Sequence, residues 1–464
     1  MTDRWKHMAA AVADFYENVG DRTVSPNVST TEIRAHLAER YGEFARPMSA
    51  EALQNDVMRM LADWQVQPTH PRYFGLFNPS VQPGAVVADA LVAVTNPQIC
   101  VYSHAPGANE IERHTLRFLT RKLGGDPDSW FASFTSGGSE ANQSAVIVAM
   151  TRDLPDFARS GLTSGLSRPT IYLSAESHHS FEKISHGAGI GRDAVRTIPV
   201  DGTLRMDVDA LADAIAKDRA TGRHPLMVVA TAGTTGAGVV DPLPAIADLC
   251  REQSLWFHVD AAWGGAACLS PRLKNTIAGI ERADSITWDA HKWLSVPMGA
   301  GMFFCRHRDA VAKAFAVDPN YMPPSTSGVD EPYVSGILWS RRFIGLKLFM
   351  ALAELGEEGY RATIEHQAHI GDVIRERLVS AGWKIVNDTP LPVVCFTGPA
   401  LETGRVNAAT VVAGVQAKGV WISEVHLSGN EPSLRACVTS FRAELQDVDA
   451  LMTALREVQK DESV

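Results

Sequence analysis

The chain has 464 residues, of which 45% are hydrophobic and 21% charged, and its formal net charge is -10. This composition is ordinary for a globular protein, and the length predicts two or three domains. The acidic balance disfavours nucleic-acid binding because no basic stripe is present. No apolar run approaches the ~18 residues that a membrane-spanning helix needs.

Six cysteines lie far apart, without a CxxC pair or a Cys/His cluster. This spacing argues against a disulfide framework and against a cysteine-based zinc site. The start of the chain, Met1–Lys6, contains no apolar segment of signal type. We therefore expect a cytoplasmic protein with reduced thiols, no metal and no membrane association.

Residues 1–66 are expected to be helical, because apolar side chains recur at three- and four-residue spacing over 8–16 and 50–64. A segment this short makes a poor independent core, so it should pack on the main body or on a second subunit. The stretch His70–Ser80 is rich in aromatic residues, proline and glycine. It either lines a pocket or forms a buried connector.

Strands and helices are expected to alternate from Trp130 onward, beginning with a strand, a Gly-rich turn and a helix through Ala149. Such alternation predicts a mainly parallel sheet covered on both faces, in which ligands bind at the carboxyl ends of the strands. Further strand-like runs are 170–174, 195–200, 226–231, 255–259, 285–288 and 300–304, with helices such as 207–217 and 243–252 between several of them.

A long Pro/Gly/Ser-rich loop, Asp318–Tyr333, is expected to be functional or mobile. A helix should follow from about Arg342 to Leu355. Residues 356–464 contain further helices and strand-like runs at 391–396, 419–422 and 434–439. The predicted parts are thus a helical segment 1–66, a large domain 67–345 and a smaller α/β domain 346–464.

Lys292 lies in the turn after the run 285–288, within Asp289-Ala-His-Lys292. A lysine there can form a Schiff base with an aldehyde cofactor if its surroundings remove its charge. A surface lysine at a strand end is the ordinary alternative. We predict that Lys292 holds pyridoxal 5′-phosphate (PLP).

Two further turns fit that cofactor. Thr135–Asn142 is a Gly-rich turn at a helix N-terminus, whose N–H groups and the Ser139 hydroxyl suit a phosphate, although a plain tight turn is at least as common. Asp260 closes the run 255–259 and could pair with a protonated pyridine nitrogen, which makes the ring an electron sink. An aspartate at this position is otherwise often a helix cap.

The remaining motifs also follow strand-like runs. Small residues and hydroxyls in Thr231–Gly236 would let a flat ring or a phosphate lie close, and a simple Gly-rich loop is an equally good interpretation. The stretch Glu176–Ser180 contains two histidines, either of which could stack on a ring or act as an acid or base. Each motif is weak alone, but their order within one α/β unit is a strong signal.

This set resembles the group II PLP-dependent amino-acid decarboxylases, the family of glutamate and aromatic L-amino-acid decarboxylases. The resemblance extends from His70-Pro-Arg-Tyr-Phe to Leu434-Arg-Ala-Cys. It implies an α/β protein of PLP-dependent fold type I. It also implies a seven-stranded, mainly parallel sheet in the large domain, a smaller C-terminal domain, and a homodimer with sites at the interface.

The resemblance assigns roles residue by residue. Lys292 is the Schiff-base lysine, Asp260 pairs with the pyridine nitrogen, His178 stacks on the ring and Ala262 packs on its other face. Residues implied at the phosphate or close to the cofactor are Gly138, Ser139, Asp289, His291 and Thr234.

For the substrate, the resemblance implies that Arg435 holds the α-carboxylate and that Tyr333 protonates Cα, with Tyr321 as a competitor for that role. Trp263 stands where relatives often have tyrosine, and 78–80 departs from the pocket loops of both enzyme types, so substrate identity does not transfer. Candidate contacts to the substrate side chain are Phe77, Asn78 and Ser80.

The expected activity is α-decarboxylation of an L-amino acid to an amine and CO2. Oxidative decarboxylation–deamination to an aldehyde and transamination are rival reactions at the same site, and a non-catalytic PLP-binding protein is a rival of another class. The presence of Tyr333 and His178 together favours simple decarboxylation.

Overall fold

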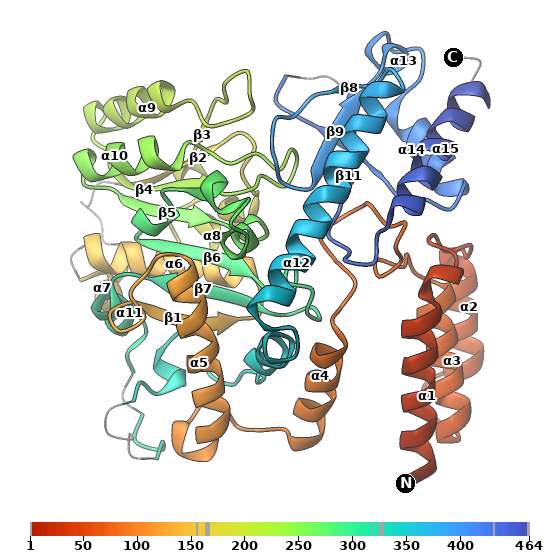
Figure 1. The fold of residues 1–464 in the computed structure, drawn as a ribbon. Coiled ribbons are helices and arrows are strands. Elements are labelled where there is room, and N and C mark those ends of the chain that lie inside the picture. The colour runs from red at the N-terminus through yellow and green to blue at the C-terminus, as the bar shows by residue number, and fades with distance from the viewer. Residues whose placement is uncertain are drawn as a thin grey trace.

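The computed structural model describes residues 2–154, 156–162, 168–317, 319–323, 329–429 and 432–461. These residues form two β-sheets, one of seven strands and one of four. The long helix α12 (Gly345–Ser380) runs between them, and three N-terminal helices stand at one side (Figure 1).

The seven-stranded sheet has the order β1-β7-β6-β5-β4-β2-β3. Neighbours from β6 to β3 run parallel, whereas β7 is antiparallel to β1 and β6. The predicted mainly parallel sheet is confirmed, and each of the six predicted runs overlaps a strand. The strands are β1 (Phe131–Thr135), β2 (Pro169–Ser174), β3 (Val195–Ile198), β4 (His224–Thr231), β5 (Trp256–Asp260), β6 (Ser285–Asp289) and β7 (Gly301–Cys305).

Helices cover both faces of this sheet, which is why its central strands are buried throughout. One apolar cluster joins the sheet to α6 (Gly138–Asp153), α7 (Phe157–Ser160), α8 (Ser180–Gly187) and α11 (Arg308–Phe315). A larger cluster on the other face includes residues of α5 (Pro106–Lys122), α9 (Val208–Ala220), α10 (Leu243–Gln253) and α12.

The second sheet is antiparallel, with the order β10-β11-β9-β8. It packs with the last turns of α12 and with the helices that follow α12 around a separate apolar core. Its elements are β8 (Lys384–Ile385), β9 (Val393–Thr397), α13 (Pro399–Glu402), α14 (Ala408–Ala417), β10 (Ser423–His426), β11 (Pro432–Cys437) and α15 (Leu445–Asp461).

The strand predicted at 419–422 is wrong, because β10 begins only at Ser423. Val420 and Ile422 are buried as the pattern required, but Trp421 forms an isolated bridge with Tyr73 and its ring stacks on the Tyr73 ring. Residues 419–422 therefore contact a distant segment of the chain and do not form the predicted strand.

Helix α12 contains a kink at Gly356, whose φ of 66° interrupts the helix just after the predicted end at Leu355. Before and just after the kink, α12 packs into the large cluster through residues such as Leu348 and Ile364, and its last turns pack into the second core through Leu378. The domain boundary at 345/346 stays a prediction, since both cores share this helix.

The N-terminal helices are α1 (Thr2–Asn18), α2 (Thr30–Tyr41) and α3 (Ala50–Asp63), followed by α4 (Pro83–Thr95). Ser29 begins α2 with a capping box, in which its side chain and that of Glu32 bond each other's backbone N–H. The helices contact the body where the Arg442 guanidinium lies 4.0 Å from the centre of the Tyr16 ring.

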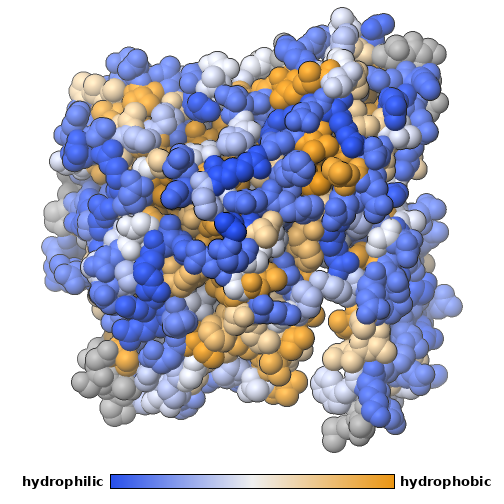
Figure 2. Space-filling view, viewed as in Figure 1, coloured by the Kyte–Doolittle hydropathy of each residue, from blue (hydrophilic) through white to orange (hydrophobic). Residues whose placement is uncertain are grey.

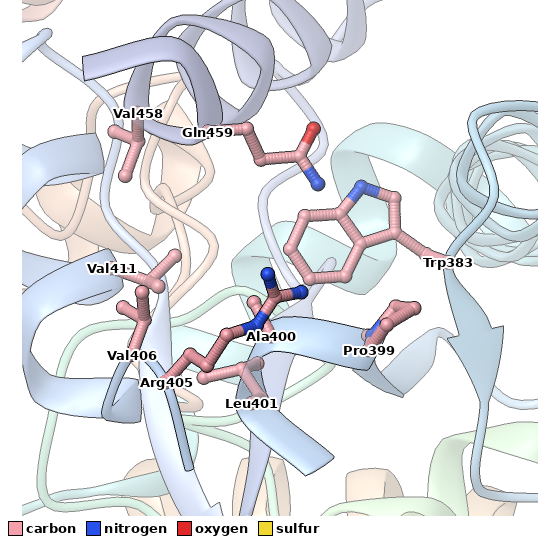
Figure 3. Close-up of a pocket in the computed structure, with 10 residues that line it drawn as sticks. Trp383, Pro399, Ala400, Leu401, Arg405, Val406, Val411, Val458 and Gln459 are labelled. Atoms are coloured by element: carbon pink, nitrogen blue, oxygen red, sulfur yellow. The ribbon is translucent and has the colours of Figure 1, made fainter. Parts of the chain in front are cut away.

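An apolar cavity of about 220 Å³ lies in the second core, between Trp383, Leu401, Val411 and Val458, with Arg405 beside it (Figure 3). None of these residues belongs to the predicted site. Among the helices that the structure describes, none is both long and apolar enough to cross a membrane. The described side chains likewise include no cluster of three or more His, Cys, Asp or Glu residues that could hold a metal ion.

Candidate active site

The candidate site lies at the carboxyl ends of two neighbouring parallel strands. Asp260 is the last residue of β5 and Asp289 is the last residue of β6, with Lys292 in the turn that follows. The backbone N–H of Asp289 donates to the carbonyl of Ala262 at 2.8 Å and so ties the two strand ends together. Ligands bind at this edge of an open α/β sheet.

Lys292 forms an ion pair with Asp289, in which Nζ lies 3.0 Å from Oδ2. The lysine side chain is 25% exposed, whereas that of Asp289 is only 2% exposed. The other oxygen of Asp289, Oδ1, is buried and has no hydrogen-bond partner in the described part of the chain. A buried acceptor without a partner destabilises the fold, so we expect a hydrogen-bond donor from outside the chain to bind Oδ1.

The turn predicted to bind the phosphate lies against the same carboxylate. Gly138 is the first residue of α6, and a Cβ placed on it would lie 2.9 Å from Asp289 Oδ2. His291 is buried beside Gly137, and its Nδ1 accepts a hydrogen bond from the Ala300 backbone. Burial lowers the pKa of His291, which favours a neutral ring whose Nε2–H can donate. Ser139 is exposed in the first turn of α6.

Asp260 is 4% exposed and accepts two hydrogen bonds. Ala262 N donates to Oδ1 at 3.1 Å, and Asn142 Nδ2 donates to Oδ2 at 2.9 Å. These two donors fix the orientation of the carboxylate. An oriented carboxylate of this kind is what a protonated pyridine nitrogen requires.

His178 is solvent-exposed and interacts electrostatically with Asp260, Lys292 and Asp289. Its Nδ1 accepts a hydrogen bond from the Ser180 backbone at 3.2 Å, which fixes the ring. Partial desolvation lowers the pKa of His178, and the charge of Asp260 opposes that shift. The imidazole is therefore held by its own turn, within electrostatic range of these three side chains, and is accessible to a ligand.

Thr234 lies close by in the chain but is turned inward. It is fully buried, and its Oγ1 accepts a hydrogen bond from Val239 N at 3.3 Å. Gly233 beside it has a φ of 98°, and a Cβ there would lie 2.9 Å from the Trp263 ring. The loop thus packs on Trp263, and a direct contact between Thr234 and the cofactor stays a prediction.

Arg435, on β11, is 5% exposed and has no acidic partner among the described residues. Nη1 donates to the carbonyl of Thr235 at 2.6 Å and Nη2 to that of Gly75 at 3.3 Å, while Nε is buried without a partner. Its guanidinium carbon lies 5.7 Å from the centre of the Phe77 ring. Because its hydrogen bonds go only to carbonyl oxygens, no carboxylate among the described residues balances the charge of this buried guanidinium. The guanidinium can therefore pair with an anion.

The segment 77–80 is mainly a buried connector. Phe77 stacks on Trp263 with ring centres 4.9 Å apart. Ser80 Oγ donates to the carbonyl of Thr69 and lies 2.9 Å from Ser440 Oγ. Asn78 is more open, with its side-chain amide 3.4 Å from Met298 Sδ. Substrate contacts of Phe77, Asn78 and Ser80 stay predictions.

Tyr333 belongs to a different cluster. Its ring stacks on Trp339 with centres 5.1 Å apart, and its backbone N–H donates to the Cys100 carbonyl. Tyr333 is buried, whereas Tyr321 is 77% exposed. No contact within the described residues joins either phenol to Lys292, so the choice between them stays a prediction.

Sequence reasoning missed Asn142, the residue that holds Asp260. The signal available was His258-x-Asp260 in β5 and Ser285-x-Thr287-x-Asp289 in β6. Polar residues at every second position of an otherwise apolar buried strand indicate a polar seam on one face of the sheet. The helix that covers this face, α6, then has to supply a polar partner.

These residues fit PLP. Asp289 contacts both the amine of Lys292 and the N-terminus of α6, and His178 interacts electrostatically with Lys292, Asp289 and Asp260. One buried oxygen of Asp289 has no hydrogen-bond partner among the described residues. Amine, carboxylate and phosphate-binding turn are the three groups that this cofactor needs from a protein.

Comparison with known proteins agrees with this geometry. Residues 32–398 match the family model "Pyridoxal-dependent decarboxylase conserved domain". An aromatic-L-amino-acid decarboxylase of Bacillus atrophaeus is 30% identical over 83% of this chain and 79% of its own length. An L-2,4-diaminobutyrate decarboxylase of Rhizobium meliloti is 33% identical over 75% of this chain and 70% of its own.

The fold is shared with solved structures of PLP-dependent enzymes. Oryza sativa TDC, solved with PLP and tryptamine, superposes with a TM-score of 0.90 at 22% identity, over 99% of this chain and 97% of the other. The sequence matches and this fold together establish PLP as the cofactor and amino-acid decarboxylation as the activity. The chain belongs to the pyridoxal-dependent decarboxylase family.

Proposed function

We propose that the chain removes the α-carboxylate of an L-amino acid as CO2, with Lys292, Asp260 and His178 as the central residues, and that it releases the amine. The observation that carries this assignment is the placement of the Lys292 amine and the Asp260 carboxylate at the ends of adjacent strands, with His178 interacting with both. PLP bound there supplies the electron sink for the loss of CO2.

The residues divide the work between them. Lys292 Nζ offers the amine that attaches the cofactor, and Asp289 balances its charge. Asp260 holds the proton of the ring nitrogen in place by accepting it in a hydrogen bond. His178 covers one ring face, and Ala262 packs on the other. The N–H groups of Gly138 and Ser139 and the Nε2–H of His291 bind the phosphate.

Arg435 is the proposed anchor for the substrate α-carboxylate. Its buried charge bonds two carbonyls and no carboxylate among the described residues, so an incoming carboxylate completes its coordination. Phe77 lies against its guanidinium and limits the positions that a substrate can take. The Tyr333 phenol is the proposed donor of the proton that replaces the carboxylate on Cα.

The assay uses PLP-loaded protein with aromatic, acidic and diamino L-amino acids, because relatives are named for each kind, an acidic amino acid decarboxylase of Bos taurus among them. Equal molar amounts of CO2 and amine from one of them would support the proposal. An aldehyde with H2O2 would assign the oxidative reaction, and a keto acid without CO2 would assign transamination. A loaded protein that turns over no amino acid would contradict the catalytic proposal.

We further propose a homodimer that buries the exposed stripe of α4. Val87, Leu91 and Val94 share one face of this helix and are 51%, 47% and 68% exposed. Figure 2 shows apolar side chains gathered where α4 lies. Leu91→Arg should convert a dimer into a monomer in light scattering, and a wild-type monomer would contradict the proposal.

We also propose that the enzyme works in the cytoplasm. Its six cysteines are free, and five of them are buried. Burial raises the pKa of Cys395 and Cys437 to about 12, which keeps these thiols protonated and unreactive. Fractionation of cells that produce the protein, followed by detection in the cytosolic and membrane fractions, tests this location.

A further inference from the structure

Hydrogen-bonding side chains occupy every second position of β5 and β6, two strands that are buried on both faces. A period of two places these side chains on the same face of the sheet, the one that α6 covers. Buried strands of this kind are normally apolar, so a continuous polar row must have a use. The row consists of Trp256, His258 and Asp260 on β5 and Ser285, Thr287 and Asp289 on β6.

The direction of each hydrogen bond follows from Asp260, because a carboxylate only accepts. Asn142 must therefore turn its Nδ2 toward Asp260, at 2.9 Å, which leaves its Oδ1 facing His258 and Thr287. That oxygen accepts from Thr287 Oγ1 at 2.6 Å and from His258 Nε2 at 3.1 Å. His258 consequently carries its proton on Nε2.

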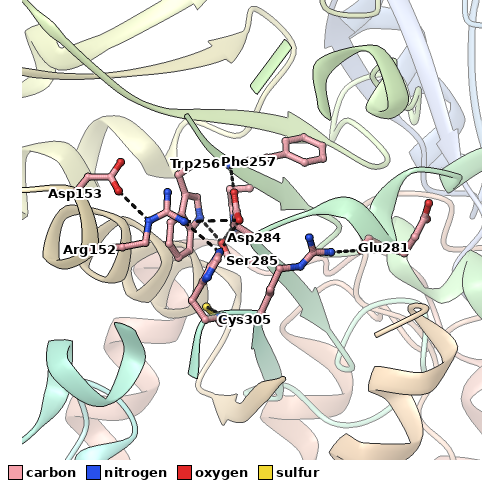
Figure 4. A network of polar contacts seen from close by, with 11 residues as sticks. Arg152, Asp153, Trp256, Phe257, Glu281, Asp284, Ser285 and Cys305 are labelled. Carbon is pink, nitrogen blue, oxygen red and sulfur yellow. Dashed lines mark hydrogen bonds and ion pairs between the residues drawn. The ribbon is translucent and has the colours of Figure 1, made fainter. Parts of the chain in front are cut away.

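The far end of the row is consistent with this assignment. With its proton on Nε2, neutral His258 accepts at Nδ1 from the Ser285 hydroxyl, 2.8 Å away. Ser285 Oγ in turn accepts from the Trp256 indole N–H at 2.8 Å, and an indole can only donate (Figure 4). Complete burial lowers the pKa of His258 to about 4, so the neutral ring is the form present near pH 7.

Asn142 is saturated by these contacts. Its oxygen accepts two hydrogen bonds, one Nδ2 hydrogen points to Asp260 and the other to Ser180 Oγ at 3.5 Å. The side chain is only 2% exposed, so it cannot exchange any of these partners for water. Its amide therefore has one orientation, and so does the Asp260 oxygen that it holds.

We propose that Asn142 is a positioning residue that fixes the plane of the Asp260 carboxylate toward the pyridine nitrogen of the cofactor, supported from behind by Thr287, His258, Ser285 and Trp256. This inference rests on the proposed role of Asp260. All the donors of the row point toward that carboxylate, and aligned hydrogen bonds of this kind polarise one another. Asn142 itself touches neither the substrate nor the reacting atoms.

The test compares two cofactors on apoprotein: PLP, and deazapyridoxal 5′-phosphate, in which a C–H group replaces the ring nitrogen. Asn142→Leu keeps the number and branching of the side-chain heavy atoms, with a modest increase in volume, and removes every side-chain hydrogen bond. We expect it to weaken PLP binding by about 10- to 100-fold, the effect of one hydrogen bond to a charged group. Binding of the deaza cofactor should change by less than about threefold, since it makes no contact through the nitrogen.

Two further variants calibrate the measurement. Ser144→Ala removes a buried hydroxyl of the same helix that bonds only the Glu140 carbonyl, and it should leave both affinities unchanged. Asp260→Asn should remove the preference for PLP over the deaza cofactor. A kcat that falls in Asn142→Leu while KM for the amino acid stays constant would further support positioning.

The outcomes separate the two proposals. Equal weakening of both cofactors by Asn142→Leu would show that Asn142 only fills space, and would overturn the inference. An unchanged PLP preference in Asp260→Asn would overturn the role of Asp260 itself. If circular dichroism shows Asn142→Leu to be unfolded, Thr287→Val decides: a selective loss of PLP affinity supports the relay, and wild-type affinities contradict it.

Discussion

The Nζ of Lys292 lies 3.0 Å from Oδ2 of Asp289, and a side chain at Gly138, on the phosphate turn, would touch the same oxygen. Asp289 thus contacts both the predicted Schiff-base amine and the helix N-terminus predicted to bind the phosphate. Its second oxygen has no partner within the described residues. The pair therefore balances the charge of the lysine and leaves one buried carboxylate oxygen without a partner in the described part of the chain.

Replacing Lys292 with alanine should abolish covalent attachment of PLP. After reduction with borohydride, mass spectrometry should find one cofactor per wild-type chain and none on Lys292→Ala. The best control is Lys347→Met. Burial lowers the pKa of Lys347, and an amine with a lowered pKa is the other candidate for reaction with the aldehyde. Its Nζ is bound to the Met298 carbonyl at 2.8 Å, so this variant should still carry the cofactor. A labelled Lys292→Ala chain would refute the assignment.

Gly138→Ala should weaken PLP binding, because its Cβ would overlap Asp289 Oδ2 at 2.9 Å. Relief of such an overlap costs ~1–3 kcal/mol, which corresponds to an increase in Kd of about 5- to 150-fold. Titration of the apoprotein, followed by visible absorbance, measures this. Gly107→Ala is the matched control: it also lies in the first turn of a helix, but no atom lies within 4 Å of the added Cβ. An equal effect of both changes would contradict the prediction.

The fold was predictable where a single local pattern decided it. Apolar runs in a parallel sheet are buried on both faces, so the runs around β2, β4, β5 and β6 stand out in the sequence. Lys292 and Asp260 could be placed because each directly follows such a run. The order of β1 and β7 in the sheet could not be read in this way, since it depends on pairing between distant segments.

The residues that support the site were harder to predict for the same reason. Asn142 and Asp260 are 118 positions apart, and the sequence around Asn142 contains no pattern that predicts their hydrogen bond. Thr234 illustrates the opposite case. Its hydroxyl lies in a loop predicted to contact the cofactor, but it points inward and accepts a hydrogen bond from the Val239 backbone. Side-chain direction depends on tertiary packing, which spacing alone does not reveal.

Arg435→Met should raise KM for the amino acid and leave PLP affinity unchanged. The variant keeps much of the apolar packing against Phe77 but removes the buried charge. Loss of a charged hydrogen bond to the α-carboxylate predicts a KM about 10- to 100-fold higher. The product amine has no carboxylate, so its inhibition constant should hardly change. A parallel loss of amine binding would show that Arg435 only maintains the pocket.

His258 should make stability depend on pH. Its pKa is about 4 in the folded chain against 6.5 for an unperturbed histidine, because it is fully buried. Between these values only the unfolded state takes up the proton, so stability falls as the pH drops from about 6.5 to about 4, by about 3 kcal/mol in total. The groups that face the ring are Asp260 on its own strand, Ser285 and Thr287 from β6, Asn142 from α6 and Phe181 from α8.

Urea unfolding at several pH values measures this dependence. His258→Gln should be less stable than wild type at pH 7, because it disturbs the relay, but its unfolding midpoint should change less between pH 6.5 and 4.5. His426→Gln is the control, since the His426 side chain is 83% exposed and its loss should leave the slope unchanged. An identical slope in wild type and His258→Gln would show that other groups dominate.

Tyr333→Phe should suppress amine formation, because it removes the proposed proton donor and keeps the ring stacked on Trp339. Loss of a general acid costs about 100- to 10,000-fold in rate. Because Tyr333 is buried, the prediction requires its segment to reach the site of its own or of the partner subunit. Without this proton donor, a larger fraction of turnovers should follow the oxidative reaction, so the amounts of aldehyde and H2O2 should rise relative to amine. Tyr321→Phe should keep the wild-type products, and the reverse pattern would transfer the role to Tyr321.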